Sequence, residues 1–241
     1  MKKIFQDKRN LVILLLGVLY LAGIPRGGVR YALWVMGGIA ICAAVDFLIN
    51  KYYLKIKLVP KSAVISGFIV AGILDYRESW IVLIIFSLLA VFSKHIIKYK
   101  KKHIYNPANA ALFIAALFKY PLTWSIESNI YLIIIFGAFF VYSLKKHFHI
   151  LGFLTFFMPL FYFFGEVNPV LITSWFFLFV MLIEPKTSGF GVLRGFLFGS
   201  AAGIFSFLIF KIFPGRDFFV PSLFIANSLN PVLDWAKKRL S

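Results

Sequence analysis

Ten strongly apolar segments, separated by short polar connections, dominate this sequence and restrict what it can fold into. They span residues 11–24, 31–50, 62–74, 79–94, 106–118, 128–144, 150–165, 169–183, 191–212 and 218–234. They make the chain 61% hydrophobic, with a mean hydropathy of +0.88, whereas soluble domains are about 45–50% apolar. The pattern predicts an all-α polytopic integral membrane protein with about ten transmembrane helices.

The distribution of basic residues predicts how these segments are oriented. If both termini lie in the cytoplasm, the outer connections keep few of the 26 Lys and Arg residues, namely Arg26, Arg30, Arg77, Lys119, Lys211 and Arg216. This asymmetry follows the positive-inside rule, so we expect a multi-pass protein of the cell (inner) membrane with cytoplasmic N- and C-termini. Membrane orientation then explains the formal charge of +17 without nucleic acid, and anionic lipids are expected at the cytoplasmic face.

The first apolar segment resembles a signal peptide but lacks a small-residue cleavage site. Ile24-Pro25-Arg26 follows it, so we expect it to be retained as the first span.

Ten spans divide into two sets of five, and an odd number of spans inverts the second set relative to the first. The fifth and tenth segments both carry an Asn–Pro element, and the third and eighth both end at an acid, Asp75 and Glu184. We therefore predict a single transmembrane domain, residues 1–241, with inverted five-helix repeats at about 11–118 and 128–234. Some of its helices are expected to be short or broken.

The stretch around Asn106-Pro107-Ala108-Asn109 predicts a helix that starts inside the membrane profile. Its apolar run ends by Phe118, which leaves about 20 Å of helix against a hydrocarbon core of about 30 Å. Pro107 lacks an N–H and suits a first helical turn, while non-helical backbone at membrane depth must be buried or line a cavity. A helix start that Asn106 merely caps remains the alternative.

Several other residues carry weaker predictions. Glycines recur every fourth residue on the ninth segment, and this spacing predicts close helix–helix contact, although a flat ligand could lie in the same groove. Asp46 is an acid inside the second segment and predicts either a functional group or a side chain that reaches the interface beside Lys51. Cys42 is expected to be a small buried hydrophobe. The glycines are Gly191, Gly195, Gly199 and Gly203.

The histidines do not predict a metal centre. His95 and His103 flank one basic loop and His147 and His149 lie in the next, without Cys, Asp or Glu in either loop. The sequence contains no Ser-His-Asp constellation, Gly-rich phosphate loop or paired carboxylates. We therefore assign no catalytic residue and no metal ligand.

A set of landmarks in this order resembles the D subunit of the Rnf electron-transport complex and the B subunit of the sodium-translocating NADH:quinone reductase. The landmarks, which cover about residues 60–235, are SGFIVAG at 66–72, SKHI at 93–96, IYNPA at 104–108, YP at 120–121, EPKTS at 184–188, PVLD at 231–234, and Gly195, Gly199 and Asn227.

The resemblance implies a flavin-carrying membrane subunit of an ion-translocating electron-transport complex, with other membrane and peripheral subunits as partners. The family esterifies flavin mononucleotide to a Thr in a long outer loop after the fifth span. Here that loop is only residues 119–127, with Thr123 and Ser125 but no such motif, so covalent flavin is not expected. A second, non-covalent flavin lies near the Asn-Pro-Ala element in the family.

We therefore expect non-covalent riboflavin or FMN at a site shared by two polar elements and a turn. The candidate residues are Asn106, Pro107, Ala108, Asn109, Thr187, Ser188, Asn227 and Asn230. Asn side chains can hydrogen bond an isoalloxazine edge inside an apolar slot. Two alternatives remain open: a transporter or channel for a small or flavin-like solute on the same fold, and a non-redox scaffold subunit whose basic face docks a partner.

Overall fold

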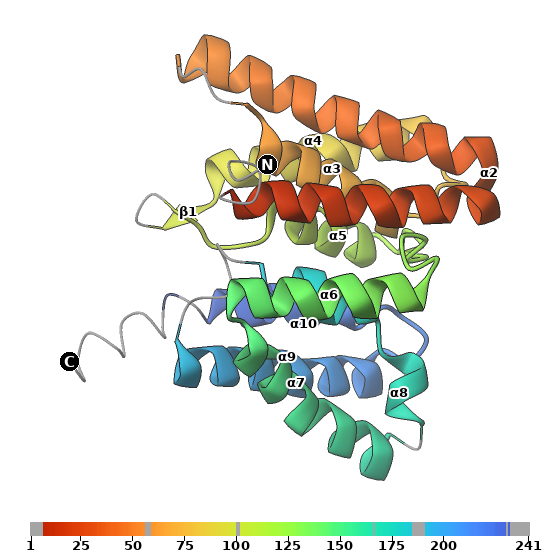
Figure 1. The fold of residues 1–241 in the computed structure, drawn as a ribbon, viewed down its shortest axis with the longest axis vertical. Helices are drawn as coiled ribbons and strands as arrows, with labels where there is room; N and C mark the ends of the chain where they lie inside the picture. Colours follow the sequence, from red (N-terminus) through yellow and green to blue (C-terminus); the bar gives the residue numbers. More distant parts are fainter. Residues whose placement is uncertain are drawn as a thin grey trace. The chain divides into compact units, whose positions relative to one another are not determined.

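A computed structural model describes residues 7–55, 59–99, 102–165, 167–184, 191–229 and 231. The described residues form two compact units. Unit 1 is drawn from Met1–Ile96 and Pro107–Phe136, and unit 2 from Ile97–Asn106 and Gly137–Ser241. Figure 1 shows that both units are built from helices. The all-α class predicted from the apolar segments is therefore confirmed for the described residues, apart from one two-stranded hairpin.

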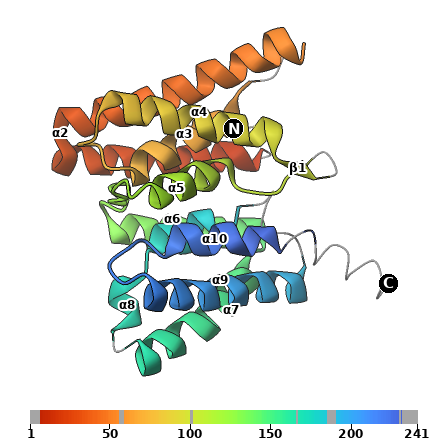
Figure 2. The same cartoon turned by 180° about the vertical axis from the view of Figure 1, so that it is seen from behind.

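The first two apolar segments form a helical hairpin in unit 1. They are joined in one helical element, α2 (Lys8–Leu48), which reverses at Gly28, where the backbone is non-helical with φ 66° and ψ −164°. The hydroxyl of Tyr20 donates to the carbonyl of Ala32 at 3.1 Å, although twelve residues of straight helix would hold them about 18 Å apart. Figures 1 and 2 show the two arms running back along each other. A π-helical turn, η1 (Ile49–Tyr53), continues the second arm.

Three further helices complete most of unit 1. These are α3 (Lys61–Ile73), α4 (Trp80–Ile96) and α5 (Pro107–Leu117), followed by the first part of α6 (Ile130–Leu144). The second arm of α2 and α3 approach backbone to backbone, since a Cβ added at Gly67 would lie 2.7 Å from the carbonyl oxygen of Gly38. Glycine at this position therefore permits the contact, as small residues do between membrane helices.

A charged cluster ties the start of α2 to the start of α3. The Asp7 carboxylate caps α2 by accepting from the backbone N–H of Arg9, and its other oxygen lies 2.9 Å from Nζ of Lys61. Hydrogen bonds from the side chains of Arg9 and Lys61 hold the pKa of the Asp7 carboxyl well below its usual range. The cluster lies outside the apolar segments.

The segment after α5 folds against the end of α3 and forms one end of unit 1. The backbone N–H groups of Thr123 and Ile126 donate to the carbonyls of Ile73 and Gly72, at 2.8 and 2.9 Å. Leu74 and Leu122 form an isolated antiparallel bridge. These bonds satisfy carbonyls that the C-terminus of α3 would otherwise leave without partners.

Unit 2 begins with a hairpin, β1 (Lys98–Tyr99) and β2 (Lys102–His103), and then packs helices around aromatic side chains. Its helical elements are the rest of α6, α7 (His147–Pro159), the π-helical turn η2 (Leu160–Phe164), α8 (Pro169–Ile172), the π-helical turn η3 (Phe177–Met181), α9 (Val192–Ile212) and α10 (Phe219–Ser228). Phe157 lies near the centre of this core, with rings of Phe153 and Phe161 at 4.7 and 4.3 Å between centroids.

The glycine row of the ninth segment lies against α7. A Cβ added at Gly199 would overlap the carbonyl oxygen of His149, and one at Gly203 would lie 2.8 Å from the carbonyl oxygen of Phe153. The helix–helix contact predicted from the four-residue spacing is therefore confirmed for these positions. Gly191, at the N-terminal end of α9, instead adopts a positive φ of 109°.

The eighth apolar segment is interrupted. After α8, the chain becomes extended at Thr173, whose hydroxyl donates to the carbonyl of Pro169 at 2.6 Å. Ser174 then accepts from the backbone N–H of Phe177 at 2.9 Å, as a cap for the following helical turn. A broken helix was predicted for some segments, and the structure places one here.

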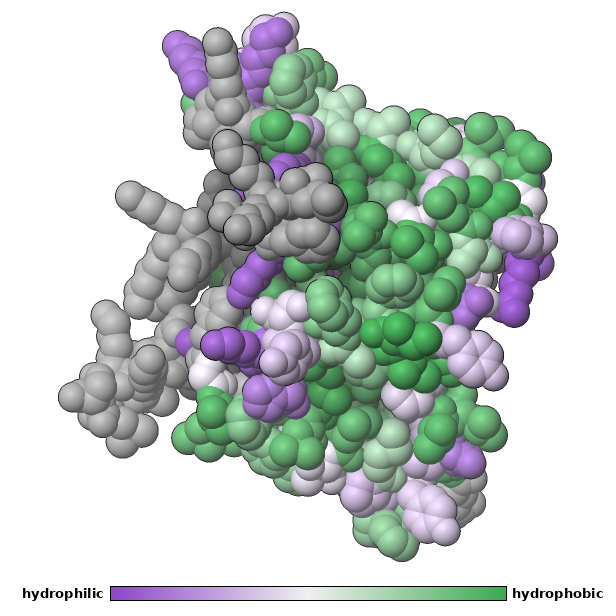
Figure 3. Space-filling model, in the orientation of Figure 1, coloured by the Kyte–Doolittle hydropathy of each residue, from purple (hydrophilic) through white to green (hydrophobic). Residues whose placement is uncertain are grey.

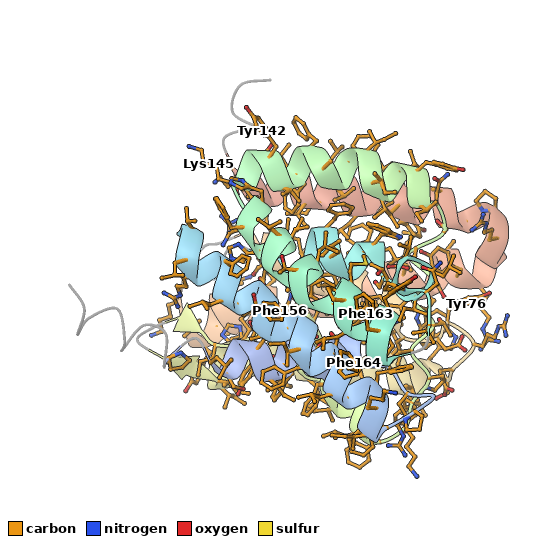
Figure 4. All side chains as sticks on the ribbon, turned by 90° about the horizontal axis from the view of Figure 1, so that it is seen from below. Tyr76, Tyr142, Lys145, Phe156, Phe163 and Phe164 are labelled. Carbon is orange, nitrogen blue, oxygen red and sulfur yellow. The ribbon has the colours of Figure 1, made fainter. Side chains whose placement is uncertain are left out.

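Three helical stretches among the described residues are long and apolar enough to cross a membrane: Lys8–Tyr53, His147–Phe164 and Val192–Ile212. The first of these contains the reversal at Gly28. Shorter apolar helices of 10–17 residues occupy five further segments, at Lys61–Ile73, Trp80–Ile96, Pro107–Leu117, Ile130–Leu144 and Phe219–Ser228. Large apolar side chains such as Phe163 and Phe164 are exposed in unit 2, where Figure 4 labels them, and hydrophobic residues cover much of the face drawn in Figure 3. An apolar exterior of this kind is typical of lipid-facing helices.

Candidate functional site

The Asn–Pro element starts α5, as the sequence predicts. Pro107 is the first residue of this helix, which is only 11 residues long. Asn109 is 0% exposed and Asn106 is 3% exposed, so the two amide side chains lie inside the protein. At 1.5 Å per residue, α5 is about 16 Å long, which confirms a helix too short to span a hydrocarbon core.

The second polar element, at the end of α10, contains an unpaired buried amide. Asn227 is 0% exposed, and neither its side-chain oxygen nor its nitrogen has a hydrogen-bond partner among the described residues. A buried polar group left unpaired costs about 1–3 kcal/mol. Such a group calls for an explanation, and a bound ligand is one.

Contacts within unit 2 bring Asn106 and Asn227 into one neighbourhood. The ring of Tyr105, which precedes Asn106, stacks on the ring of Phe224, with 4.1 Å between centroids and 4° between planes. Its hydroxyl lies 3.0 Å from the hydroxyl of Ser228, which follows Asn227. The chain segment before α5 therefore lies along the last turns of α10.

The remaining predicted site residues divide into two groups. Pro107, Ala108 and Asn109 belong to unit 1 and occupy the first turn of α5, where Ala108 is fully buried. Thr187, Ser188 and Asn230 lie outside the described residues. The structure thus brings the segments that carry Asn106 and Asn227 together in unit 2, and the grouping of all eight residues stays a prediction.

The Asn227 amide meets the requirements of a flavin edge. The pyrimidine side of an isoalloxazine alternates carbonyl acceptors with an N–H donor, and an amide offers one acceptor and two donor hydrogens. The stacked rings of Tyr105 and Phe224 supply an apolar, aromatic neighbourhood beside it. The residues present in unit 2 therefore fit a non-covalently bound flavin.

A buried ion-pair cluster in unit 1 was not predicted from the sequence. Asp46 is 1% exposed, and Nζ of Lys94 lies 2.8 and 3.0 Å from its two carboxylate oxygens. Nε2 of His95 lies 2.9 Å from the first of these oxygens. The predicted neighbour Lys51 instead lies over the rings of Phe47 and Tyr52.

The sequence contained a signal for this cluster, but that signal joined residues far apart in the chain. The second and fourth segments are both expected to end at the cytoplasmic side, which places Lys94 and His95 at the same level as Asp46. A pairing over 48 residues depends on which helices are neighbours, and α2 and α4 do pack together. One turn earlier, Cys42 is fully buried against Ala63 and Val91, as predicted.

A second basic pair, in unit 2, is buried rather than exposed at a loop. Lys146 is almost fully buried, and its Nζ lies 3.4 Å from Nε2 of His149, which packs against Gly195. Lys146, which precedes α7, and His149, which contacts Gly195 of α9, are therefore not part of an exposed basic loop, while lipid binding at the other basic loops stays a prediction.

The segment after α5 carries the two hydroxyls that were considered for a flavin ester. The hydroxyls of Thr123 and Ser125 lie 2.8 Å apart at an exposed position. Within the described ranges, no group of three or more His, Cys, Asp or Glu side chains could hold a metal ion.

Comparisons with known proteins assign no family to the chain. No protein-family model matches the sequence, and no curated protein matches it.

Proposed function

We propose that this chain is a multi-span membrane subunit that binds a flavin non-covalently and serves electron transport within a larger, ion-translocating complex. The observation that carries the proposal is the buried amide of Asn227, which has no hydrogen-bond partner within the described part of the chain and lies one turn from Phe224 of the Tyr105–Phe224 stack. The sequence landmarks shared with the Rnf and NADH:quinone reductase subunits supply the choice of ligand. The bound flavin would carry the electrons, while the protein holds it and excludes water.

Within unit 2, Asn106 and Asn227 would hold the flavin by its polar edge. Both amides are already buried, so they would not have to give up bound water when the flavin binds. The aromatic rings at Tyr105 and Phe224 would keep water from these hydrogen bonds, which strengthens each of them. The basic loops on the predicted cytoplasmic side would dock the partner subunits.

The membrane arrangement we propose has ten spans in two inverted five-helix repeats, with both termini in the cytoplasm. The reversal at Gly28 separates the first two apolar segments, and most of the other segments carry at least one helix among the described residues, which supports the proposed arrangement. The test places single cysteines at Lys101 and at Glu166 in a chain without Cys42. We expect an impermeant thiol reagent to label only the second position in intact cells, and labelling of both would reject the arrangement.

The ligand site is tested by Asn227→Leu, with Asn168→Leu as the matched control. Asn168 is an exposed helix cap in the same unit, so its replacement should cost about 0.5–2 kcal/mol of stability and leave flavin content unchanged. Asn227→Leu should lose about 1–3 kcal/mol of flavin binding, or about 5–150-fold in affinity.

Stability without ligand separates a binding site from a structural role. Replacing an unpaired buried amide by an apolar group of similar volume is neutral or stabilising, so the flavin-free Asn227→Leu protein should unfold no earlier than the wild type. A variant that keeps full flavin occupancy, or that loses flavin only because it unfolds, would contradict the proposed role of Asn227.

A second candidate, a transporter or channel for a small or flavin-like solute, is favoured by the outer segment. That segment is short, hydrogen bonds to the end of α3 and lacks the long loop in which the family carries its flavin ester. Buried amides can bind a passing neutral solute as well as a resident cofactor. Uptake of labelled riboflavin by liposomes containing the protein, abolished by Asn227→Leu, would support transport over electron transfer.

A further inference from the structure

A pocket of about 220 Å³ lies at one end of unit 1, and its lining includes none of the residues proposed to hold the flavin. It is formed by the reversal of α2, the connection between α3 and α4, and the segment after α5. Tyr76, which Figure 4 labels, belongs to the α3–α4 connection. The segment after α5 contributes Trp124, Ser125 and Ser128. Three chain segments that are far apart in sequence thus converge on one site.

The walls of this pocket are aromatic. The rings of Tyr31 and Tyr76 meet edge to face, with 5.6 Å between centroids, and Trp124 also lines the space. Gly23 lies against the ring of Tyr31, since a Cβ there would be 2.7 Å from a ring carbon. The missing side chain at Gly23 lets Tyr31 fold under the reversal of α2. A flat, apolar group would pack well between such rings.

A buried hydroxyl in the lining has no partner. Tyr31 is 1% exposed, and its hydroxyl makes no hydrogen bond with any described residue. This hydroxyl lies beside Gly23, itself a lining residue, at 2.9 Å from where a Cβ would stand. A ligand oxygen in the pocket would accept a hydrogen bond from this hydroxyl and so remove the free-energy cost of leaving it buried without a partner.

The charged residues of the lining decide the sign of the ligand. Glu127 already has an interaction of its own, whereas Arg26 is exposed at the rim and makes no ion pair with a described residue. Nearby, Arg30 donates to the backbone carbonyls of Tyr76 and Glu78, so its guanidinium is engaged. Arg26 thus offers an exposed guanidinium at the rim, and guanidinium groups bind carboxylates bidentately.

The volume limits the size of the ligand. At about 30 Å³ per water molecule, the pocket holds about seven waters, and it is smaller than the 300–1,000 Å³ typical of sites for drug-sized ligands. None of its lining residues is among those proposed to hold the flavin, so the two sites are distinct.

We propose that this pocket binds a small monocarboxylate that carries a single ring, with the carboxylate at Arg26 and the Tyr31 hydroxyl and the ring among Tyr31, Tyr76 and Trp124. The Arg26 guanidinium supplies the charge, and the aromatic walls supply the apolar contact. On the predicted topology this end of unit 1 faces outward, where such a ligand would arrive from outside the cell.

The test uses three fluorinated probes of one shape on the full chain in detergent, followed by ¹⁹F NMR and corrected against empty micelles. They are 4-fluorobenzoate, the neutral 4-fluorobenzyl alcohol and the cationic 4-fluorobenzylamine. We expect saturable binding of the benzoate, tighter than either analogue. Non-saturable benzoate binding, or tighter binding of the alcohol or amine, would overturn the proposal.

Variants locate the site. Arg26→Gln should weaken benzoate binding about tenfold, or 1.4 kcal/mol, whereas the control Arg216→Gln, an exposed arginine in unit 2, should leave it unchanged. Tyr31→Phe removes an unpaired hydroxyl, so it should fold normally and still weaken benzoate binding several-fold. Equal affinity of Arg26→Gln and wild type, or equal weakening by both Arg→Gln changes, would refute the assignment.

Discussion

Replacing Asp46 by Asn should destabilise unit 1 by leaving a buried cation without its counter-charge. The carboxylate is 1% exposed and holds Lys94 through both oxygens and His95 through one. Asn keeps the shape of the side chain but cannot balance the charge of Lys94. The effect should therefore be electrostatic rather than a loss of packing.

The expected magnitude follows from the burial of the two partners. Removing one member of a buried ion pair costs about 3–5 kcal/mol. The Lys94 side chain retains 18% exposure and can recover some hydration, which places Asp46→Asn at the lower end, about 3 kcal/mol. Lys94→Met should cost less, because Nε2 of His95 lies 2.9 Å from the Asp46 carboxylate and can still hydrogen bond to it.

A double-mutant cycle in detergent measures the coupling. The free energies of unfolding of wild type, Asp46→Asn, Lys94→Met and the double variant should give a coupling energy of about 2–3 kcal/mol. The control cycle pairs Asp46→Asn with Lys51→Met, whose ammonium lies over aromatic rings and not at Asp46. Additive effects in the first cycle, or equal coupling in both, would refute the ion-pair account.

Three further predictions concern the helix contacts and the charged cluster at the start of α2. Gly199→Leu should cost at least about 1–3 kcal/mol of unfolding free energy by forcing α9 away from His149, and unchanged thermal stability in detergent would count against this contact. Gly28→Ala should lower the melting temperature because a Cβ is strained at φ 66°, whereas Gly17→Ala, in open space, should not. Asp7→Asn keeps the helix cap but removes the negative charge. The pKa of Asp7 is lower in the folded protein than in the unfolded chain. The charged carboxylate therefore stabilises the fold fully above the ordinary carboxyl pKa of about 3.9, and this stabilisation is lost as the pH falls toward the folded-state pKa. The melting temperatures of wild type and Asp7→Asn should therefore differ at pH 7 and converge in acid, and a constant gap would contradict this.

Local patterns predicted much of the helical structure. The apolar segments coincide with helical elements, Pro107 starts α5, and the glycine spacing on α9 marks its contact with α7. These features depend on neighbouring residues in the chain, which the sequence displays directly. The break at Thr173 was harder to locate because a side-chain hydroxyl, rather than a proline, replaces the helical bond there.

The long-range contacts were beyond sequence reasoning. Asp46 was considered beside Lys51, its nearest cation in the chain, whereas the fold pairs it with Lys94 from another helix. Lys146 was expected in a loop and is instead buried. For the candidate site, the sequence predicted Asn106 and Asn227, and only the structure shows the stacking of Tyr105 on Phe224 that brings their segments together.

The absorption spectrum of the purified protein tests the proposed function most directly. Protein purified in mild detergent should show flavin absorption bands in the blue region of the visible spectrum. Denaturation followed by filtration should release all of the pigment into the filtrate. Release is expected because the outer segment carries no ester motif at Thr123 or Ser125. A colourless protein that stays colourless after incubation with riboflavin and with FMN would contradict flavin binding, and pigment that remains with the denatured chain would contradict non-covalent attachment.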